Sequence, residues 1–324
     1  MRTKLKAGEF IQVGSGLVVD SEELSLTQYL SHYLRKKYRP VRDLSDLEFL
    51  SLFDIQSVND LLNNGYNLKS TAAFVEHFKS RVTSEWLQPP AYLADLCINT
   101  DLVSDDELIA RAEQVLNYDL EWSGVPPELS CCGEIDWQKN TLNNDEWLAR
   151  LNRHSWWPLL GHAYQRTGQE RYAMAFARQM SNWVAGLDSI DPVETKHVWS
   201  RKQVAMRLRV SWIPAFGMFF QSPYFNTARK LEMLRVIFDQ ARFLKKQKTD
   251  DCLVLNGALV SAGITFPELR ESGSWRKTAI ERCRTSLRMP GRGSAGSGSE
   301  SETNDLRHSV NLLAFSDREL ASAG

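Results

Sequence analysis

Tryptophan, arginine, asparagine and histidine alternate in the middle of this chain. Seven of the ten tryptophans lie between Ile135 and Trp212. Indole rings pack against the C–H faces of sugars, and guanidinium groups hold carboxylates or sulfates through paired hydrogen bonds. The polar residues that accompany the tryptophans are Asn152, Arg153, His154, Arg207 and Arg209. The pattern predicts a concave surface for an acidic polysaccharide. Burial is the alternative for each tryptophan, and a solvated charge is the alternative for each arginine.

Composition excludes two classes of partner. The formal net charge of -1 argues against nucleic acid, which requires a concentrated basic surface. No apolar run approaches the roughly 18 residues of a transmembrane helix, so we expect no membrane association. Near the N-terminus, Gln12, Gly14 and Gly16 interrupt a short apolar run, and no cleavage site of a signal peptide is visible.

Metal and disulfide chemistry lack sequence support. The five cysteines form no CxxC pair, and Cys131 and Cys132 are adjacent, which favours free thiols. The six histidines form no HxxxH or HExxH motif. We therefore predict no metal site and no cofactor.

Apolar residues recur at helical spacing along most of the chain, which predicts an all-α fold. Connections as short as Thr167-Gly168 keep successive helices antiparallel, as in a curved array or toroid of helical hairpins. A strand hairpin at 10–19, around Gly14-Ser15-Gly16, is the exception. The predicted helices span residues 21–37, 68–86, 105–116, 145–166, 169–185, 199–220, 226–246, 253–262 and 274–287.

Several motifs resemble the N-terminal helical domain of the heparinase II/III and alginate lyase superfamily. They are IDWQKN, DEWLARLNRHSWWPLLGHAYQRTGQERYAMAFARQMSNWV, RLRVSWIPAF and LVLNGALVSAGITFPELRESGSW, in this order between Ile135 and Leu287. The resemblance implies an incomplete (α/α) toroid that packs on a C-terminal antiparallel β-sandwich in full-length members. It also implies β-elimination on uronate polysaccharides, in which a polar residue neutralises the uronate carboxylate, a base removes the ring proton and a tyrosine protonates the leaving oxygen.

The resemblance also assigns roles to residues. Residues 152–154 and Trp156 would line the substrate groove. Either Arg207 or Arg209 would bind uronate or sulfate, and Trp212 would stack on a sugar. The domain division it implies is a variable helical part over 1–130, the toroid over 131–288, and a disordered or frameshifted Gly/Ser-rich tail over 289–324. Family members work in the periplasm or outside the cell.

The catalytic motif departs from the family pattern. Asp251 stands where the family has its carboxylate-neutralising Asn, and Cys252 stands at the His or Trp position, with Asn256 as the candidate in a shifted register. An ionised Asp about 4 Å from a uronate would cost roughly 4 kcal/mol, or on the order of a thousandfold in rate. The family tyrosine that follows the FPE segment is also missing. We therefore expect a polysaccharide lyase domain that is inactive as this chain, or alternatively a non-catalytic module that binds acidic glycan or a protein.

Overall fold

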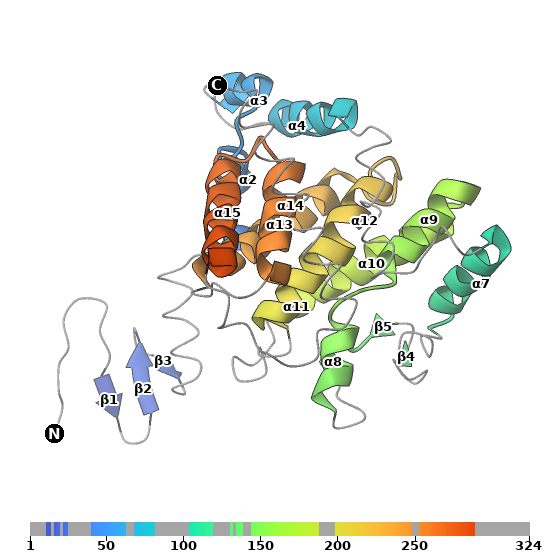
Figure 1. Cartoon of the computed structure of the whole chain (residues 1–324), viewed down its shortest axis with the longest axis horizontal. Helices are drawn as coiled ribbons and strands as arrows, with labels where there is room; N and C mark the ends of the chain where they lie inside the picture. Colours follow the sequence, from blue (N-terminus) through green and yellow to red (C-terminus); the bar gives the residue numbers. More distant parts are fainter. Residues whose placement is uncertain are drawn as a thin grey trace.

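Helices make up most of the part of the chain that the structure describes (Figure 1). The structure is a computed structural model. It describes residues 11–13, 16–19, 22–24, 40–62, 68–81, 104–118, 130–131, 134–138, 144–187, 198–247 and 253–288. The predicted all-α class is confirmed.

Most helices of the middle and C-terminal regions lie side by side in one array, and α8 lies at its edge near β5 (Figure 1). Their bounds are α7 Asp105–Leu116, α8 Asp145–Leu151, α9 Trp157–Thr167, α10 Glu170–Gly186, α11 Arg201–Met206, α12 Ile213–Met218, α13 Thr227–Lys246, α14 Leu253–Thr265 and α15 Ser272–Arg288. Gly168 adopts a φ of 66° between α9 and α10, where the absence of a side chain permits a left-handed residue. The predicted α9–α10 hairpin is confirmed, because Tyr164 near the end of α9 contacts Glu170 at the start of α10.

Two predicted helices are interrupted. The region predicted as one helix over 145–166 divides into α8 and α9, and His154 in the intervening turn has a φ of 56°. Pro158 lies in the first turn of α9, a position that proline fits because the backbone N–H it lacks would have no partner within the helix there. Within the predicted helix 199–220, residues Arg207–Trp212 form a π-helix, η5, between α11 and α12.

The N-terminal region contains short strands and helices. The predicted strand hairpin is confirmed by β1 (Ile11–Val13) and β2 (Gly16–Val19), which pair antiparallel. A third strand, β3 (Glu22–Leu24), pairs with β2, so the predicted helix over 21–37 is wrong at its start, and residues 25–37 lie outside the described part. The remaining elements are η1 Val41–Asp43, α2 Asp46–Leu50, α3 Gln56–Leu62, α4 Leu68–Arg81, β4 Ser130–Cys131 and β5 Glu134–Ile135.

The segment around α2 is fastened to the connection between α14 and α15. The Asp54 backbone N–H donates to the Glu268 carbonyl at 2.6 Å, and the Arg270 N–H donates to the Leu52 carbonyl at 3.0 Å. His77 of α4 lies 2.9 Å from the carboxylate of Glu268, the glutamate of the FPE segment. Glu268 therefore joins α4 to the helical array.

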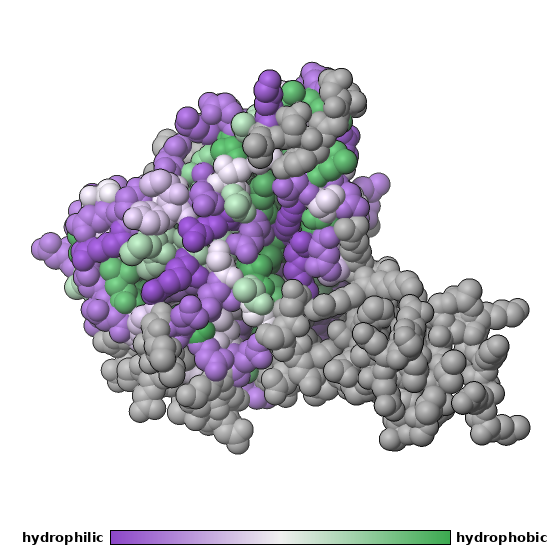
Figure 2. All heavy atoms as spheres, turned by 180° about the vertical axis from the view of Figure 1, so that it is seen from behind, coloured by the Kyte–Doolittle hydropathy of each residue, from purple (hydrophilic) through white to green (hydrophobic). Residues whose placement is uncertain are grey.

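The described surface is largely hydrophilic on the face seen from behind, with hydrophobic patches between the polar residues (Figure 2). The interior contains most of the described aromatic side chains, including Trp156, Trp157, Trp183, Trp212 and Trp275. No helix within the described ranges has the length and apolar character needed to span a bilayer.

Candidate functional site

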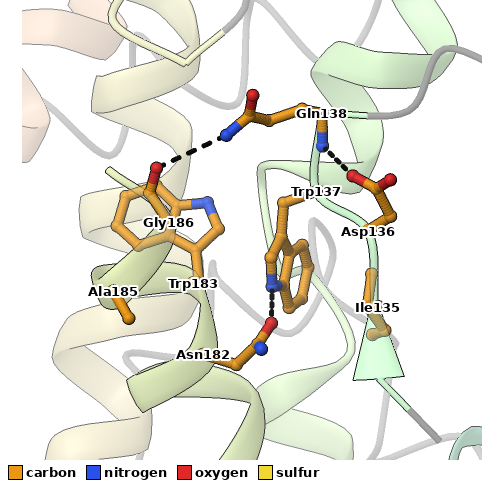
Figure 3. A pocket seen from close by; sticks show the side chains of 8 residues that line it. All are labelled: Ile135, Asp136, Trp137, Gln138, Asn182, Trp183, Ala185 and Gly186. Atoms are coloured by element: carbon orange, nitrogen blue, oxygen red, sulfur yellow. Dashed lines mark hydrogen bonds between the residues drawn. The ribbon is translucent and has the colours of Figure 1, made fainter. Parts of the chain in front are cut away.

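A pocket of about 240 Å³ opens between the segment that follows β5 and the end of α10 (Figure 3). The described residues that line it are Ile135, Asp136, Trp137, Gln138, Asn182, Trp183, Ala185 and Gly186. Two indole rings thus lie beside two amides, a carboxylate and backbone carbonyl groups. This combination of apolar walls and hydroxyl-binding groups is suited to a small polar ligand with a ring.

Hydrogen bonds between the lining residues fix the pocket (Figure 3). The Trp137 indole N–H donates to Asn182 Oδ1 at 2.7 Å. The Gln138 side-chain amide spans the pocket and donates to the Gly186 carbonyl at 3.4 Å, and its backbone N–H donates to Asp136 Oδ1 at 3.1 Å. The segment 136–138 is therefore held against α10 before any ligand arrives.

Asn152 joins the two aromatic walls from behind. Its Oδ1 accepts the Trp183 indole N–H at 2.8 Å, and its Nδ2 donates to the Trp137 carbonyl at 3.0 Å and to the Leu148 carbonyl at 3.0 Å. Asn152 is fully buried. It therefore positions the pocket walls and has no surface of its own to offer to a ligand.

The π-helix holds the turn that contains Asn152. Arg207 Nη1 donates to the Asn152 carbonyl at 3.1 Å, and Ser211 Oγ donates to the Arg153 carbonyl at 2.7 Å. The Trp212 indole N–H donates to Nδ1 of His154 at 3.0 Å. Three residues of η5 thus bind three consecutive residues of the turn, which accounts for the left-handed conformation of His154.

Arg207 is a buried cation held by neutral oxygens. In addition to Asn152, it donates through Nε to Gln240 Oε1 at 3.1 Å and through Nη2 to the Val198 carbonyl at 2.9 Å. Its guanidinium lies over the Trp183 ring, 4.7 Å from the centroid. Burial lowers the pKa of Arg207 to about 9, so it remains charged at neutral pH.

His154 occupies an aromatic cage. Its ring stacks on Trp157 with centroids 4.2 Å apart, and the edges of the Trp137 and Trp183 rings approach it at about 5 Å. Burial and, to a lesser extent, the charge of Arg207 hold the pKa of His154 well below 6.5. Because Nδ1 accepts the Trp212 N–H, the neutral ring carries its proton on Nε2.

The lowered pKa of His154 predicts a pH dependence of stability. Below about pH 6.5, His154 binds a proton in the unfolded chain but not in the folded chain. The contribution of His154 to the free energy of unfolding is therefore fully present above this pH and is lost as the pH falls. The difference in unfolding free energy between the original protein and His154→Asn should shrink by about 1.4 kcal/mol for each pH unit below 6.5. Asparagine tolerates the left-handed backbone.

Urea unfolding of both proteins at several pH values measures this difference. Asp239, whose pKa burial raises to about 6, contributes with the opposite sign. Its contribution is present in both proteins and cancels. A difference that stays constant with pH would contradict a neutral buried His154.

The predicted open groove wall is wrong for six of its seven residues. Asn152, His154, Trp156, Arg207, Arg209 and Trp212 are all buried, at 2% exposure or less. Several of their polar groups pair with one another or with neighbouring residues, and Trp156 donates to Gln179 Oε1 at 2.9 Å, whereas Nε2 of His154 is buried without a hydrogen-bond acceptor among the described residues. Arg153 is partly exposed and donates to Gln203 and Glu146. The predicted residues do come together, but they lie behind the pocket walls.

The predicted catalytic residues are not assembled into a described site. Asp251 and Cys252 lie outside the described residues. Asn256, the shifted-register candidate, is 1% exposed and lies near the Cys283 thiol, whose pKa is raised by burial. Asn256 therefore packs between α14 and α15 and does not present its amide to solvent.

Sequence reasoning missed the residues that line the pocket. Trp137 and Gln138 were noted only as part of IDWQKN, and Asn182 was not singled out. Gln179, which accepts both the Trp156 and Trp157 indole N–H groups, was also missed. Asn182 follows Gln179 by three residues, so the two amide side chains lie on similar sides of α10. This spacing was the sequence signal that could have indicated a polar face of α10 next to the tryptophans. Within the described ranges, no group of three or more potential metal ligands converges.

Solved structures similar to this chain support the helical fold. The heparan sulfate lyase HepC of Pedobacter heparinus matches with a TM-score of 0.68 and 20% identity, over 82% of this chain and 42% of that one. A heparinase III structure matches with a TM-score of 0.58 and 20% identity, over 76% of this chain and 38% of that one. The matched parts of both share the helical arrangement described above.

Curated relatives are similar in sequence. A heparin-sulfate lyase of Pedobacter heparinus is 30% identical over 159 residues, which are 48% of this chain and 24% of the relative. A heparin-sulfate lyase of Bacteroides stercoris is 22% identical over 247 residues, which are 70% of this chain and 36% of the relative. The chain thus spans roughly a quarter to a third of the length of these relatives.

The family model described as Heparinase II/III N-terminus matches residues 46–289. The match begins well before Ile135, where the resemblance of the sequence motifs starts. Since it takes in more than half of the 324 residues, the chain belongs to the Heparinase II/III N-terminus family.

Proposed function

We propose that the chain is the N-terminal helical part of a polysaccharide lyase and that it contacts a uronate-containing glycosaminoglycan. The family match over 46–289 is the observation that carries this proposal. Relatives named as heparin-sulfate lyases support the glycosaminoglycan as the substrate class. The pocket of Figure 3 supports contact with sugar, because its lining combines tryptophan side chains with the amides of Gln138 and Asn182.

We further propose that these 324 residues bind the polysaccharide without cleaving it. Asp251 stands at the position of the family's carboxylate-neutralising Asn, Cys252 stands at the His or Trp position, and Asn256 is buried. An ionised Asp251 would repel the uronate that the elimination requires to be neutralised. A C-terminal β-sandwich, as in full-length family members, is the partner that would supply further catalytic groups.

In this proposal the parts of the chain have different roles. Residues 131–288 provide the sugar-binding toroid, residues 1–130 are the variable N-terminal part, and residues 289–324 follow the toroid. Asn152 and Arg207 act as positioning residues behind the pocket, which is consistent with their hydrogen bonds and burial.

Incubation with heparan sulfate, heparin and alginate tests the proposal. We expect retention on immobilised heparan sulfate, no retention on neutral dextran, and no rise in the ultraviolet absorbance of an unsaturated uronate over a day. Appearance of that absorbance would overturn the proposed inactivity. Absence of retention on all three uronate polymers would overturn glycan binding and would favour a module that binds a protein.

A further inference from the structure

We infer that the pocket between Trp137 and Asn182 is a subsite for one uncharged pyranose ring. Its assignment to a glycosaminoglycan rests on the proposed function, whereas the chemistry of the ring is argued from the pocket itself. The volume of about 240 Å³ lies below the roughly 300 Å³ at which pockets for drug-sized ligands begin. A single ring is therefore the fitting occupant.

The lining has the two kinds of surface that a pyranose presents. Ile135, Trp137 and Trp183 form the apolar part of the lining, and Trp137, at 6%, is the most exposed of the three (Figure 3). The amides of Gln138 and Asn182 contain both donor and acceptor atoms, which match ring hydroxyls that both donate and accept. These amides come from opposite sides of the pocket, one from the segment after β5 and one from α10 (Figure 3).

Charge favours an uncharged ring. Asp136 contributes a carboxylate to the lining, and Glu134 accepts from Asn182 Nδ2 at 3.2 Å close by. Among the described lining residues none is Lys, Arg or His. A sulfate or carboxylate entering the pocket would meet acidic groups, which repel it, whereas a neutral ring gains acceptors for its hydroxyls.

The walls are preorganised, which lowers the entropic cost of binding. Asn182 fixes the Trp137 indole, and Asn152 links Trp183 to the Trp137 backbone. The neighbouring pocket, which shares Ala185, differs in chemistry. Its arginines, Arg42 and Arg235, lie beside the carboxylates Asp43 and Asp46. The Trp137 pocket is therefore a better candidate than the neighbouring pocket for binding the hydroxyl groups of an uncharged sugar.

Saturation-transfer NMR with the neutral trisaccharide chitotriose tests the subsite in the full chain. We expect transfer to one ring of the trisaccharide, and an affinity about 3- to 10-fold weaker in Gln138→Ala, as one lost hydrogen bond implies. The matched control is Gln165→Ala, which removes an exposed glutamine from α9 and should leave the affinity unchanged. Glucuronate should give no transfer with the original protein and measurable transfer with Asp136→Asn.

Equal affinities of the original protein, Gln138→Ala and Gln165→Ala, or no transfer from the folded original protein, would overturn the subsite. Heparan sulfate retention together with no chitotriose transfer would overturn the subsite and leave the proposed function standing. Chitotriose transfer that depends on Gln138, without any retention on uronate polymers, would support the subsite and overturn the proposed function.

Discussion

Replacement of Arg207 by alanine is expected to lower the free energy of unfolding by about 4 kcal/mol, which is near the upper end for single substitutions. The guanidinium is fully buried and donates to three oxygens, those of Gln240, Asn152 and Val198. Alanine leaves these acceptors without donors and removes the cation over the Trp183 ring. Urea denaturation at neutral pH measures the loss.

Arg150→Ala is the matched control for this substitution. The Arg150 side chain is about half exposed and pairs with Glu146 at 3.5 Å, so its removal should cost less than about 1 kcal/mol. Arg207→Lys should be nearly as damaging as Arg207→Ala, because an ammonium group lacks the planar fork that reaches three separate oxygens. Losses of similar size for Arg207→Ala and Arg150→Ala would show that Arg207 does not hold the turn to the π-helix.

Replacement of Asn152 by alanine is expected to cost about 3 kcal/mol. The change leaves the buried Trp183 indole N–H and the Trp137 carbonyl without their partners, and each unsatisfied buried group costs roughly 1–3 kcal/mol. Since both groups belong to the pocket walls, the same substitution should also weaken chitotriose binding. Thermal or urea unfolding measures the first effect, and NMR titration measures the second.

Asn144→Ala provides the comparison for the same chemical change. Asn144 is exposed and caps α8 by accepting the backbone N–H groups of Glu146 and Trp147. Loss of such a cap typically costs about 1 kcal/mol, and it should leave chitotriose binding unchanged. If Asn144→Ala and Asn152→Ala destabilise equally, or if both weaken sugar binding, Asn152 has no special role behind the pocket.

Helical periodicity was sufficient to predict most of the fold. The range 105–116 was predicted with the bounds that α7 has, and 226–246 differs from α13 by one residue. Both have polar N-cap residues, Ser104 and Asn226, that accept a backbone N–H of the first turn. Local signals of this kind are present in the sequence because they act over a single turn.

The interruptions were harder to predict because they depend on contacts across the fold. The apolar spacing between Trp199 and Phe220 fits a continuous helix, and the π-helix at Arg207–Trp212 is accompanied by contacts to the distant turn at 152–154. Pro158 was a local sign of the break before α9 and was overlooked.

The candidate site was predicted in its chemistry but not in its geometry. Arginine is usually solvated, and the oxygens that satisfy Arg207 include the backbone carbonyls of Asn152 and Val198, which no side-chain pattern reveals. The sequence therefore correctly indicated that the tryptophan-rich stretch gathers in one region. Which of its residues line the pocket and which lie behind it could be read only from the three-dimensional contacts. Trp137 and Trp183 both line the pocket, but Trp183 is 1% exposed and is nearly as buried as Trp156 and Trp212.

The most direct test of glycan contact at this pocket is an NMR titration of the full chain with a heparan sulfate oligosaccharide, observed at the tryptophan indole N–H signals. The signal of Trp137 should shift, together with the side-chain amides of Gln138 and Asn182, while that of the interior Trp212 should stay in place. A titration in which the Trp137, Gln138 and Asn182 signals all remain unchanged while the oligosaccharide binds would contradict contact at this pocket.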